Sequence, residues 1–231
     1  MFRSLLMLKV ILISYLIVLI APKITIGEAN KTLKLSSDSA IAQSVGIFDL
    51  FGWRRPRISL GTRGICILTP GSIRKFSVWN TRPLFLWKGR ISQITVRDRE
   101  TKKILWVQAI RPTDQQIYYT APTPLQSGKQ YEWTFANPVS STSRWLAFDV
   151  IPIEQHTQIA TDLQTLEKQW KSKGESTEAI ALQKASYFVD RNLWSDALQA
   201  LYEIENPSQS FSQQRQAYVK DICSSRSSNT P

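Results

Sequence analysis

Basic side chains are the residues of this 231-residue chain that could most readily bind a ligand. Four of them lie within the seven positions of RDRETKK, between the alternating segments ISQITV and ILWVQAI, which predict the two strands of a hairpin. A turn at this point gathers the four side chains, with Asp98 and Glu100 as the only acids nearby in sequence. We expect this patch to attract an anion; its members are Arg97, Arg99, Lys102 and Lys103.

Two tryptophans beside basic residues extend the candidate binding site. Trp87 lies in RPLFLWKG, where a carbohydrate stacked on the ring is one possible cover for the strand. Trp53 precedes Arg54 and Arg55 in VGIFDLFGWRRPR, a combination that suits a bilayer interface, because rings lie at headgroup depth and guanidinium groups meet phosphates. In the simpler interpretation, which we favour, this segment packs over the domain that follows it.

Signatures of catalysis and of cofactor binding are missing from the sequence. His156 is the single histidine, and there is no C-x-x-C, G-x-S-x-G, H-E-x-x-H or phosphate-binding glycine loop. We therefore expect no metal, no cofactor and no enzyme activity. A carboxylate pair that hydrolyses envelope polymers is the least favoured alternative, because most acids in the C-terminal half fall on the polar faces of expected helices.

The two cysteines, Cys66 and Cys223, lie near opposite ends of the expected folded part. In an oxidising compartment they could form one disulfide, which would close a long loop and restrict the unfolded chain. Two buried free thiols are the alternative. If the fold brings the two positions together, their Cα atoms should lie about 4.4 to 6.8 Å apart.

The N-terminal residues predict export. A short basic lead is followed by the apolar run VILISYLIVLIA, and Gly27 and Ala29 have the small side chains of a cleavage site. Residues 1–29 are therefore expected to be a secretory signal or, since the apolar run is nearly long enough to span a bilayer, an N-terminal anchor. Either interpretation places the remaining chain in the periplasm or cell envelope, where nucleic acid is not a natural partner.

Charge is distributed unevenly along the chain, whose formal net charge is +11. Residues 54–111 contain fourteen Lys and Arg against two acids, whereas residues 154–205 contain nine acids against five bases. This asymmetry indicates an anionic partner for the basic half, or partial neutralisation of one half by the other.

The periodicity of apolar residues predicts an α+β fold. Residues 30–57 are expected to be a mobile leader that includes the aromatic and basic segment, and residues 58–153 an antiparallel, immunoglobulin-like β-sandwich of about seven short strands. After Pro152 the period becomes helical, which predicts three to four helices over residues 154–223, followed by a disordered tail over residues 224–231.

The strand RPLFLWKG is apolar on both faces. Leu84 and Leu86 should point one way, and Phe85 and Trp87 the other, so that both faces need a cover. The candidates for the second face are the C-terminal helices, a partner molecule or a carbohydrate. We favour the helices, because their own apolar faces also need a surface to bury against.

The segment ALQKASYFVDRNLWSDALQALYEIENP resembles one degenerate tetratricopeptide repeat. Its small, aromatic and proline residues lie near the repeat's expected positions, namely Ala185, Phe188, Trp194, Ala197 and Pro207. Arrays need about three units to form a concave binding face. We therefore expect this hairpin to pack against the sandwich, with a role in gripping a partner peptide as the alternative.

From residue 54 onward the chain also resembles a group of uncharacterised exported cyanobacterial proteins. The segments that carry this resemblance are RRPRISLGTRGICILTPG, RPLFLWKG, LQSGKQYEWTF and YFVDRNLWSDALQALYEI, after an N-terminal signal segment. The resemblance implies a β-domain followed by a helical region. It implies no activity, because these motifs are structural.

The sequence as a whole predicts a non-catalytic exported envelope protein. We expect the β-domain to present basic and aromatic residues to an anionic envelope component, such as polysaccharide, peptidoglycan or lipid headgroups at the membrane surface. The alternative is a protein–protein adaptor that uses the C-terminal helical hairpin.

Overall fold

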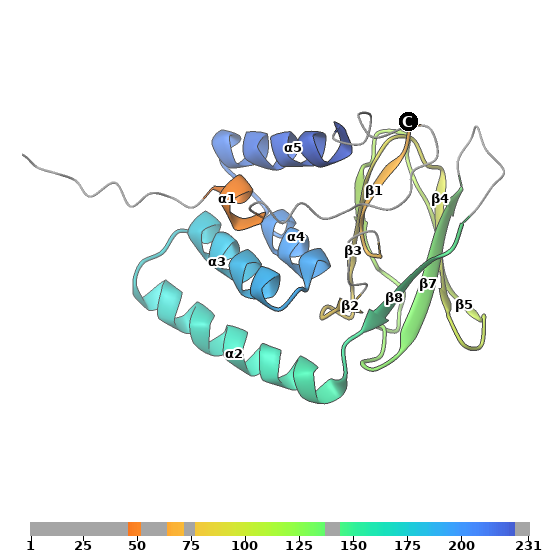
Figure 1. Ribbon diagram of the computed structural model, residues 1–231, viewed down its shortest axis with the longest axis horizontal. Helices are drawn as coiled ribbons and strands as arrows, with labels where there is room; N and C mark the ends of the chain where they lie inside the picture. Colours follow the sequence, from red (N-terminus) through yellow and green to blue (C-terminus); the bar gives the residue numbers. More distant parts are fainter. Residues whose placement is uncertain (1–45, 52–63, 72–76, 137–143, 225–231) are drawn as a thin grey trace, which may run out of the picture. The chain divides into compact units, whose positions relative to one another are not determined.

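The computed structural model describes residues 46–51, 64–71, 77–136 and 144–224, all of which belong to one compact unit. Two packed β-sheets are followed by four C-terminal helices (Figure 1). The predicted order of an α+β fold is therefore confirmed, but the strand order does not confirm an immunoglobulin-like topology. The expected signal or anchor, most of the expected leader and the tail after residue 224 lie outside the described residues.

Eight strands form the two sheets. The smaller sheet has the order β1-β3-β6 and is antiparallel, with β1 at Cys66–Thr69, β3 at Leu84–Lys88 and β6 at Gln116–Tyr118. The larger sheet has the order β2-β8-β7-β4-β5, and its strands are Ser77–Val78, Leu146–Val150, Gln130–Ala136, Gln93–Asp98 and Ile104–Ala109. Among the described strands, β2 and β8 are the one pair that runs in parallel. The predicted hairpin around RDRETKK is confirmed as β4 and β5.

Strand β3 contributes to two separate cores. Phe85 and Trp87 are buried among the residues between the sheets, whereas Leu84 and Leu86 are buried in a cluster that includes residues of all the helices. The alternation of side chains along a strand sends the two pairs to opposite faces. The prediction that the C-terminal helices cover the second face of this strand is confirmed.

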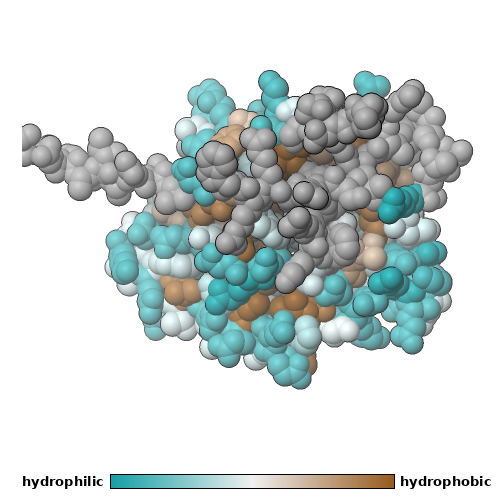
Figure 2. Space-filling model, viewed as in Figure 1, coloured by the Kyte–Doolittle hydropathy of each residue, from teal (hydrophilic) through white to brown (hydrophobic). Residues whose placement is uncertain are grey.

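The four C-terminal helices are α2 (Ile153–Ser172), α3 (Thr177–Asp190), α4 (Trp194–Tyr202) and α5 (Gln209–Ser224). Helix α4 lies nearest β2 and β3 in Figure 1, and every residue from Trp194 to Leu201 is buried. The hairpin of α3 and α4 therefore packs against the β-half through α4, as the sequence analysis expected. On the face shown in Figure 2, hydrophobic residues form separate areas among hydrophilic ones.

Polar side chains of α4 also satisfy backbone groups of the β-half. The Asp196 carboxylate accepts hydrogen bonds from the backbone N–H groups of Trp79 and Asn80, both at 2.8 Å. Gln199 Oε1 accepts one from the N–H of Leu84 at 2.9 Å. These donors lie at and before the start of β3, and buried backbone N–H groups need an acceptor. Helix α4 thus holds this segment through polar as well as apolar contacts.

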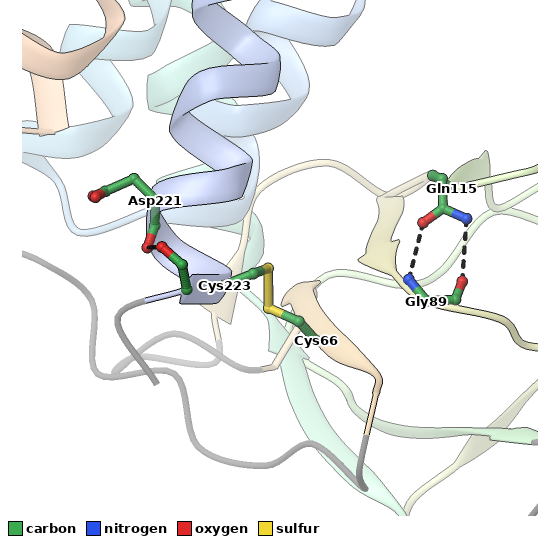
Figure 3. Close-up of a disulfide and its surroundings, with 6 residues drawn as sticks. Cys66, Gly89, Gln115, Asp221 and Cys223 are labelled. Atoms are coloured by element: carbon green, nitrogen blue, oxygen red, sulfur yellow. Dashed lines mark hydrogen bonds between the residues drawn. A yellow bond between two sulfur atoms is a disulfide. The ribbon is translucent and has the colours of Figure 1, made fainter. Parts of the chain in front are cut away.

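A disulfide joins the two halves. Cys66 on β1 is bonded to Cys223 near the end of α5, with Cα atoms 5.8 Å apart, as the sequence predicted (Figure 3). Beside it, the amide of Gln115 makes two hydrogen bonds with the backbone of Gly89. Such a disulfide is typical of oxidising compartments outside the cytoplasm. In the described part of the chain, no helix is long and apolar enough to cross a membrane.

The short helix α1 (Ile47–Phe51) packs on the helical region. Ile47 is fully buried, and the ring of Phe51 is stacked on Tyr218 of α5 with centroids 4.5 Å apart. This part of the segment VGIFDLFGWRRPR therefore packs over the domain, as the favoured interpretation expected. Trp53, Arg54 and Arg55 lie outside the described residues.

The contrast between two phenylalanines of α1 gives a matched test of this packing. Phe51 is 2% exposed and Phe48 is 45% exposed, one turn of helix away. We expect Phe51→Ala to lower the free energy of unfolding by about 3 kcal/mol, and Phe48→Ala by less than about 1 kcal/mol. Urea unfolding of the two variants measures this difference. Equal effects would show that the burial of Phe51 does not contribute to the stability of the domain.

Candidate anion-binding surface

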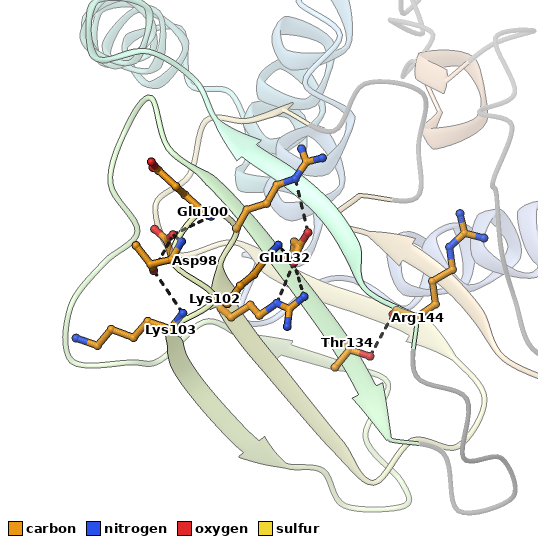
Figure 4. A network of polar contacts seen from close by, with 10 residues as sticks. Asp98, Glu100, Lys102, Lys103, Glu132, Thr134 and Arg144 are labelled. Carbon is orange, nitrogen blue, oxygen red and sulfur yellow. Dashed lines mark hydrogen bonds and ion pairs between the residues drawn. The ribbon is translucent and has the colours of Figure 1, made fainter.

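Glu132 is the centre of the basic patch that the sequence predicts. Its carboxylate lies 2.7 Å from Nη2 of Arg97, 3.6 Å from Nε of Arg99 and 3.2 Å from Nζ of Lys102 (Figure 4). Burial raises the pKa of Glu132, but the hydrogen bonds from Arg97 and Lys102 outweigh it, and the pKa is lower than usual. Three of the four predicted cations therefore share one carboxylate, which neutralises part of the patch.

The register of the larger sheet explains why Glu132 occupies this position. Glu132 on β7 is paired with Arg97 on β4, so that their side chains lie on the same face of the sheet. On that face the guanidinium carbon of Arg97 lies 3.6 Å from the ring centroid of Trp145, which immediately precedes β8. Glu132 and Trp145 are two site residues that the sequence analysis missed.

Asp98 shapes the hairpin turn. Its carboxylate accepts hydrogen bonds from the N–H groups of Glu100 and Thr101 and from the Thr101 hydroxyl, at 3.0, 2.7 and 2.9 Å. The two hydrogen bonds from Thr101 are the largest causes of the lowered pKa of Asp98. Asp98 is therefore occupied within the turn, and the main counter-charge of the patch is Glu132. Asp98 and Glu100 are the only acids near the patch in sequence, but strand pairing adds Glu132 from a distant position.

Lys103 differs from the other three predicted cations. Its side chain points away from Glu132 in Figure 4 and lines a pocket of about 450 Å³ at this end of the sheets. Lys129 lines the same pocket, and neither lysine side chain has a hydrogen bond or a close ion pair with a described residue. Asp98 also lines this pocket, and the charge of Lys129 contributes to the lowered pKa of Asp98. The exposed apolar lining of this pocket comes from Ile104, Pro122 and Pro124. A pocket of this kind can hold an anion that also has apolar surface.

The wall of this pocket is fixed by hydrogen bonds. The Arg82 guanidinium donates to the backbone oxygens of Tyr119, Ala121 and Pro122 at 3.4, 2.8 and 3.2 Å, and the Tyr131 hydroxyl accepts from the N–H of Gln126 at 2.8 Å. These contacts order the segment between β6 and β7 before any ligand arrives. Preorganisation of this kind reduces the entropic cost of binding.

A second pocket, of about 490 Å³, adjoins the first. It is lined by Arg99, Glu100 and Gln130 among others, and it shares Asp98 and Lys129 with the first pocket. Lys129 therefore lies where the two pockets meet. We call the whole area the hairpin-end surface and define it by its cations and one ring: Arg97, Arg99, Lys102, Lys103, Lys129 and Trp145.

The structure brings together the four predicted basic residues of the hairpin but does not place Trp87 beside them, and Trp53, Arg54 and Arg55 lie outside the described residues. Trp87 is 1% exposed in the core between the sheets, so its ring is not available to a carbohydrate or another ligand. The four basic residues of the hairpin also differ in how far they could be replaced without loss of stability. Arg97 is largely buried between Glu132 and Trp145, and its removal would leave a carboxylate that is only 13% exposed without its closest partner.

No group of three or more His, Cys, Asp or Glu side chains is placed to hold a metal ion within the described ranges. Comparisons with protein-family models, curated proteins and solved structures found no match, so the resemblance to exported cyanobacterial proteins gains no support.

Proposed function

We propose that this protein is a non-catalytic envelope protein that binds an anionic polysaccharide at the hairpin-end surface. The observation that carries the proposal is the pair Lys103 and Lys129, two exposed cations on one ordered, partly apolar pocket, without an ion pair among the described residues. Carboxylate or sulphate groups of a polysaccharide supply the charge, and the apolar faces of sugar rings suit the exposed lining residues Ile104, Pro122 and Pro124.

The other cations of the surface support the same function less directly. The net charge around Glu132 stays positive, because three cations share its one carboxylate: Arg97, Arg99 and Lys102. This positive charge favours the approach of a polyanion. Arg99 extends the positive area into the second pocket. A chain that carries repeated anionic groups could therefore contact both pockets at once, with Lys129 between them.

Charge-neutral replacement of Lys103 and Lys129 tests this proposal. We expect the double variant Lys103→Gln, Lys129→Gln to bind immobilised polygalacturonate about tenfold more weakly than the wild type, because two exposed ion pairs of roughly 0.7 kcal/mol each are lost. Binding of the wild type should also fall steeply between 50 and 300 mM salt, since exposed charges are screened. Thermal unfolding should be unchanged, because both side chains are exposed.

The double variant Lys88→Gln, Arg90→Gln is the matched control. It removes the same charge from exposed positions that lie before the start of β4, at the opposite end of that strand from the hairpin turn. Equal retention of the two double variants, or binding that is independent of salt, would contradict the proposal. Retention on anionic liposomes but not on the polysaccharide would assign the surface to a membrane instead.

The adaptor alternative has less support. Helix α4 of the helical hairpin is buried from Trp194 to Leu201, and α1 covers part of α3 and α5. A groove along this hairpin for a partner helix would therefore compete with contacts that the chain makes with itself.

A further inference from the structure

A separate pocket of about 460 Å³ lies between α2 and the turn that joins α3 to α4. It shares no lining residue with the two pockets of the hairpin-end surface. Its apolar floor consists of Ile151, Ile159 and Leu193, all of which are buried. The rim is polar and carries one cation, Arg191, and one acid, Asp162. A volume of this size accommodates a small ligand of a few residues.

Three contacts, two with Tyr187 and one with Asp162, hold the Arg191 side chain in place. Its guanidinium carbon lies 3.5 Å from the ring centroid of Tyr187, Nη1 donates to the backbone oxygen of Tyr187 at 3.2 Å, and Nη2 lies 3.7 Å from Asp162. The side chain is nevertheless 40% exposed. A guanidinium has five N–H donors, and a single hydrogen bond uses one of them here, so that donors remain for a ligand carboxylate.

Asp162 lies farther from Arg191, at 3.7 Å, than from its two hydrogen-bond donors. Its carboxylate accepts hydrogen bonds from the Tyr187 hydroxyl and from Nε2 of Gln158, both at 2.7 Å. The hydrogen bond from Tyr187 is the largest cause of the lowered pKa of Asp162. Asp162 therefore remains ionised and orients Tyr187, on whose ring Arg191 is stacked.

Amide side chains complete the rim. Gln155 and Asn192 line the pocket, and their side chains make no hydrogen bond with another described residue. Gln158 uses its amide nitrogen for Asp162, which leaves its carbonyl oxygen for a donor. Carboxamides match the donor and acceptor of a peptide bond. The rim thus combines one carboxylate-binding group with several groups that suit a peptide backbone.

We propose that this pocket binds the carboxyl-terminal end of a peptide whose last side chain is aliphatic. Arg191 receives the terminal carboxylate, Gln155 and Asn192 contact the preceding peptide bonds, and the aliphatic side chain lies on the floor formed by Ile151, Ile159 and Leu193. The proposal is independent of polysaccharide binding at the hairpin-end surface.

Titration of the isotope-labelled protein with three ligands tests the proposal by NMR. The peptide acetyl-Ala-Ala-Leu with a free carboxylate should bind with a dissociation constant between about 10 μM and 1 mM, and shift the amide signals around residues 191–193. The same peptide with an amidated terminus should bind at least tenfold more weakly, because the charge-assisted hydrogen bonds are lost. Isovalerate, which has the carboxylate and the aliphatic group but no peptide bond, should also bind at least tenfold more weakly.

Two variants locate the interaction without unfolding the protein. Asn192 has a φ of 61°, which glycine adopts readily, so Asn192→Gly should preserve the turn and weaken peptide binding about threefold or more. Gln155→Ala, on the exposed side of α2, should act similarly, whereas Gln164→Ala, on the opposite face of the same helix, should not.

Three outcomes would overturn the proposal. They are the absence of shifts around residues 191–193 at 10 mM peptide, equal binding of the free and amidated peptides, and unchanged binding by Asn192→Gly and Gln155→Ala together. Equal binding of isovalerate and the peptide would overturn the assignment to a peptide.

Discussion

Replacing Cys66 and Cys223 together by serine is expected to lower the free energy of unfolding by about 3 to 5 kcal/mol. The disulfide spans 157 positions, and restricting a loop of that length in the unfolded chain corresponds to roughly 5 kcal/mol in the chain-entropy description. Urea unfolding of the oxidised wild type and of the double variant measures the difference. The chain has no other cysteine, so exchange with a third thiol does not complicate the result.

The same variant tests how β1 and α5 depend on each other. Phe211, Tyr218 and Ile222 of α5 stay packed in the helical core after the bond is removed, so α5 should remain helical but exchange its amide hydrogens faster than α3. Wild type treated with a reductant is the control and should behave as the variant does. A loss of less than about 1 kcal/mol, or free thiols in the untreated protein, would contradict the role given to this disulfide.

Asp196→Ala is expected to have an effect of similar size. The change removes the acceptors of the Trp79 and Asn80 N–H groups, and unsatisfied backbone donors of this kind cost about 1 to 3 kcal/mol each. We expect a loss of about 2 to 4 kcal/mol at pH 5. Asp190→Ala, which removes an acid from an exposed position at the end of α3, is the control and should change stability by less than about 0.5 kcal/mol.

The loss caused by Asp196→Ala should depend on pH. Burial raises the pKa of Asp196 to about 7 from an ordinary value of 3.8, although the N–H groups of Trp79 and Asn80 act in the opposite direction. Between these values the folded wild type keeps a proton that the unfolded chain has lost, so its stability falls as pH rises. The difference between wild type and variant should therefore be larger at pH 4.5 than at pH 8. A difference that grows with pH would show that Asp196 is ionised throughout.

Short-range patterns were sufficient to predict the elements of the fold. The alternation in RPLFLWKG indicated a strand with two apolar faces, and the structure places Leu86 against the helices and Phe85 between the sheets. The two cysteines indicated a disulfide without showing that β1 and α5 are neighbours. The polar contacts of Asp196 could not be foreseen, because they join α4 to backbone groups more than 100 positions away.

The candidate site was predicted only in part, because some of its residues are distant in sequence. Arg97, Arg99, Lys102 and Lys103 are close in sequence, so one turn was enough to group them. Glu132 joins them through the register of β4 and β7, and Trp145 through its position before β8. Register depends on the packing of the whole sheet, and a single sequence shows only the alternation within each strand. Trp87 was wrongly included in the candidate site. Its ring is adjacent in sequence to a basic residue but is buried in the core.

The most direct test of the proposed function is to locate bound polyanion on the wild-type protein. Titration of the isotope-labelled protein with a short oligogalacturonate at 50 mM salt should shift the NMR signals of Lys103, Lys129 and the pocket wall at residues 119–126, and 300 mM salt should reverse these shifts. Shifts confined to the helices, or no shifts at any position, would contradict the assignment of anion binding to the hairpin-end surface.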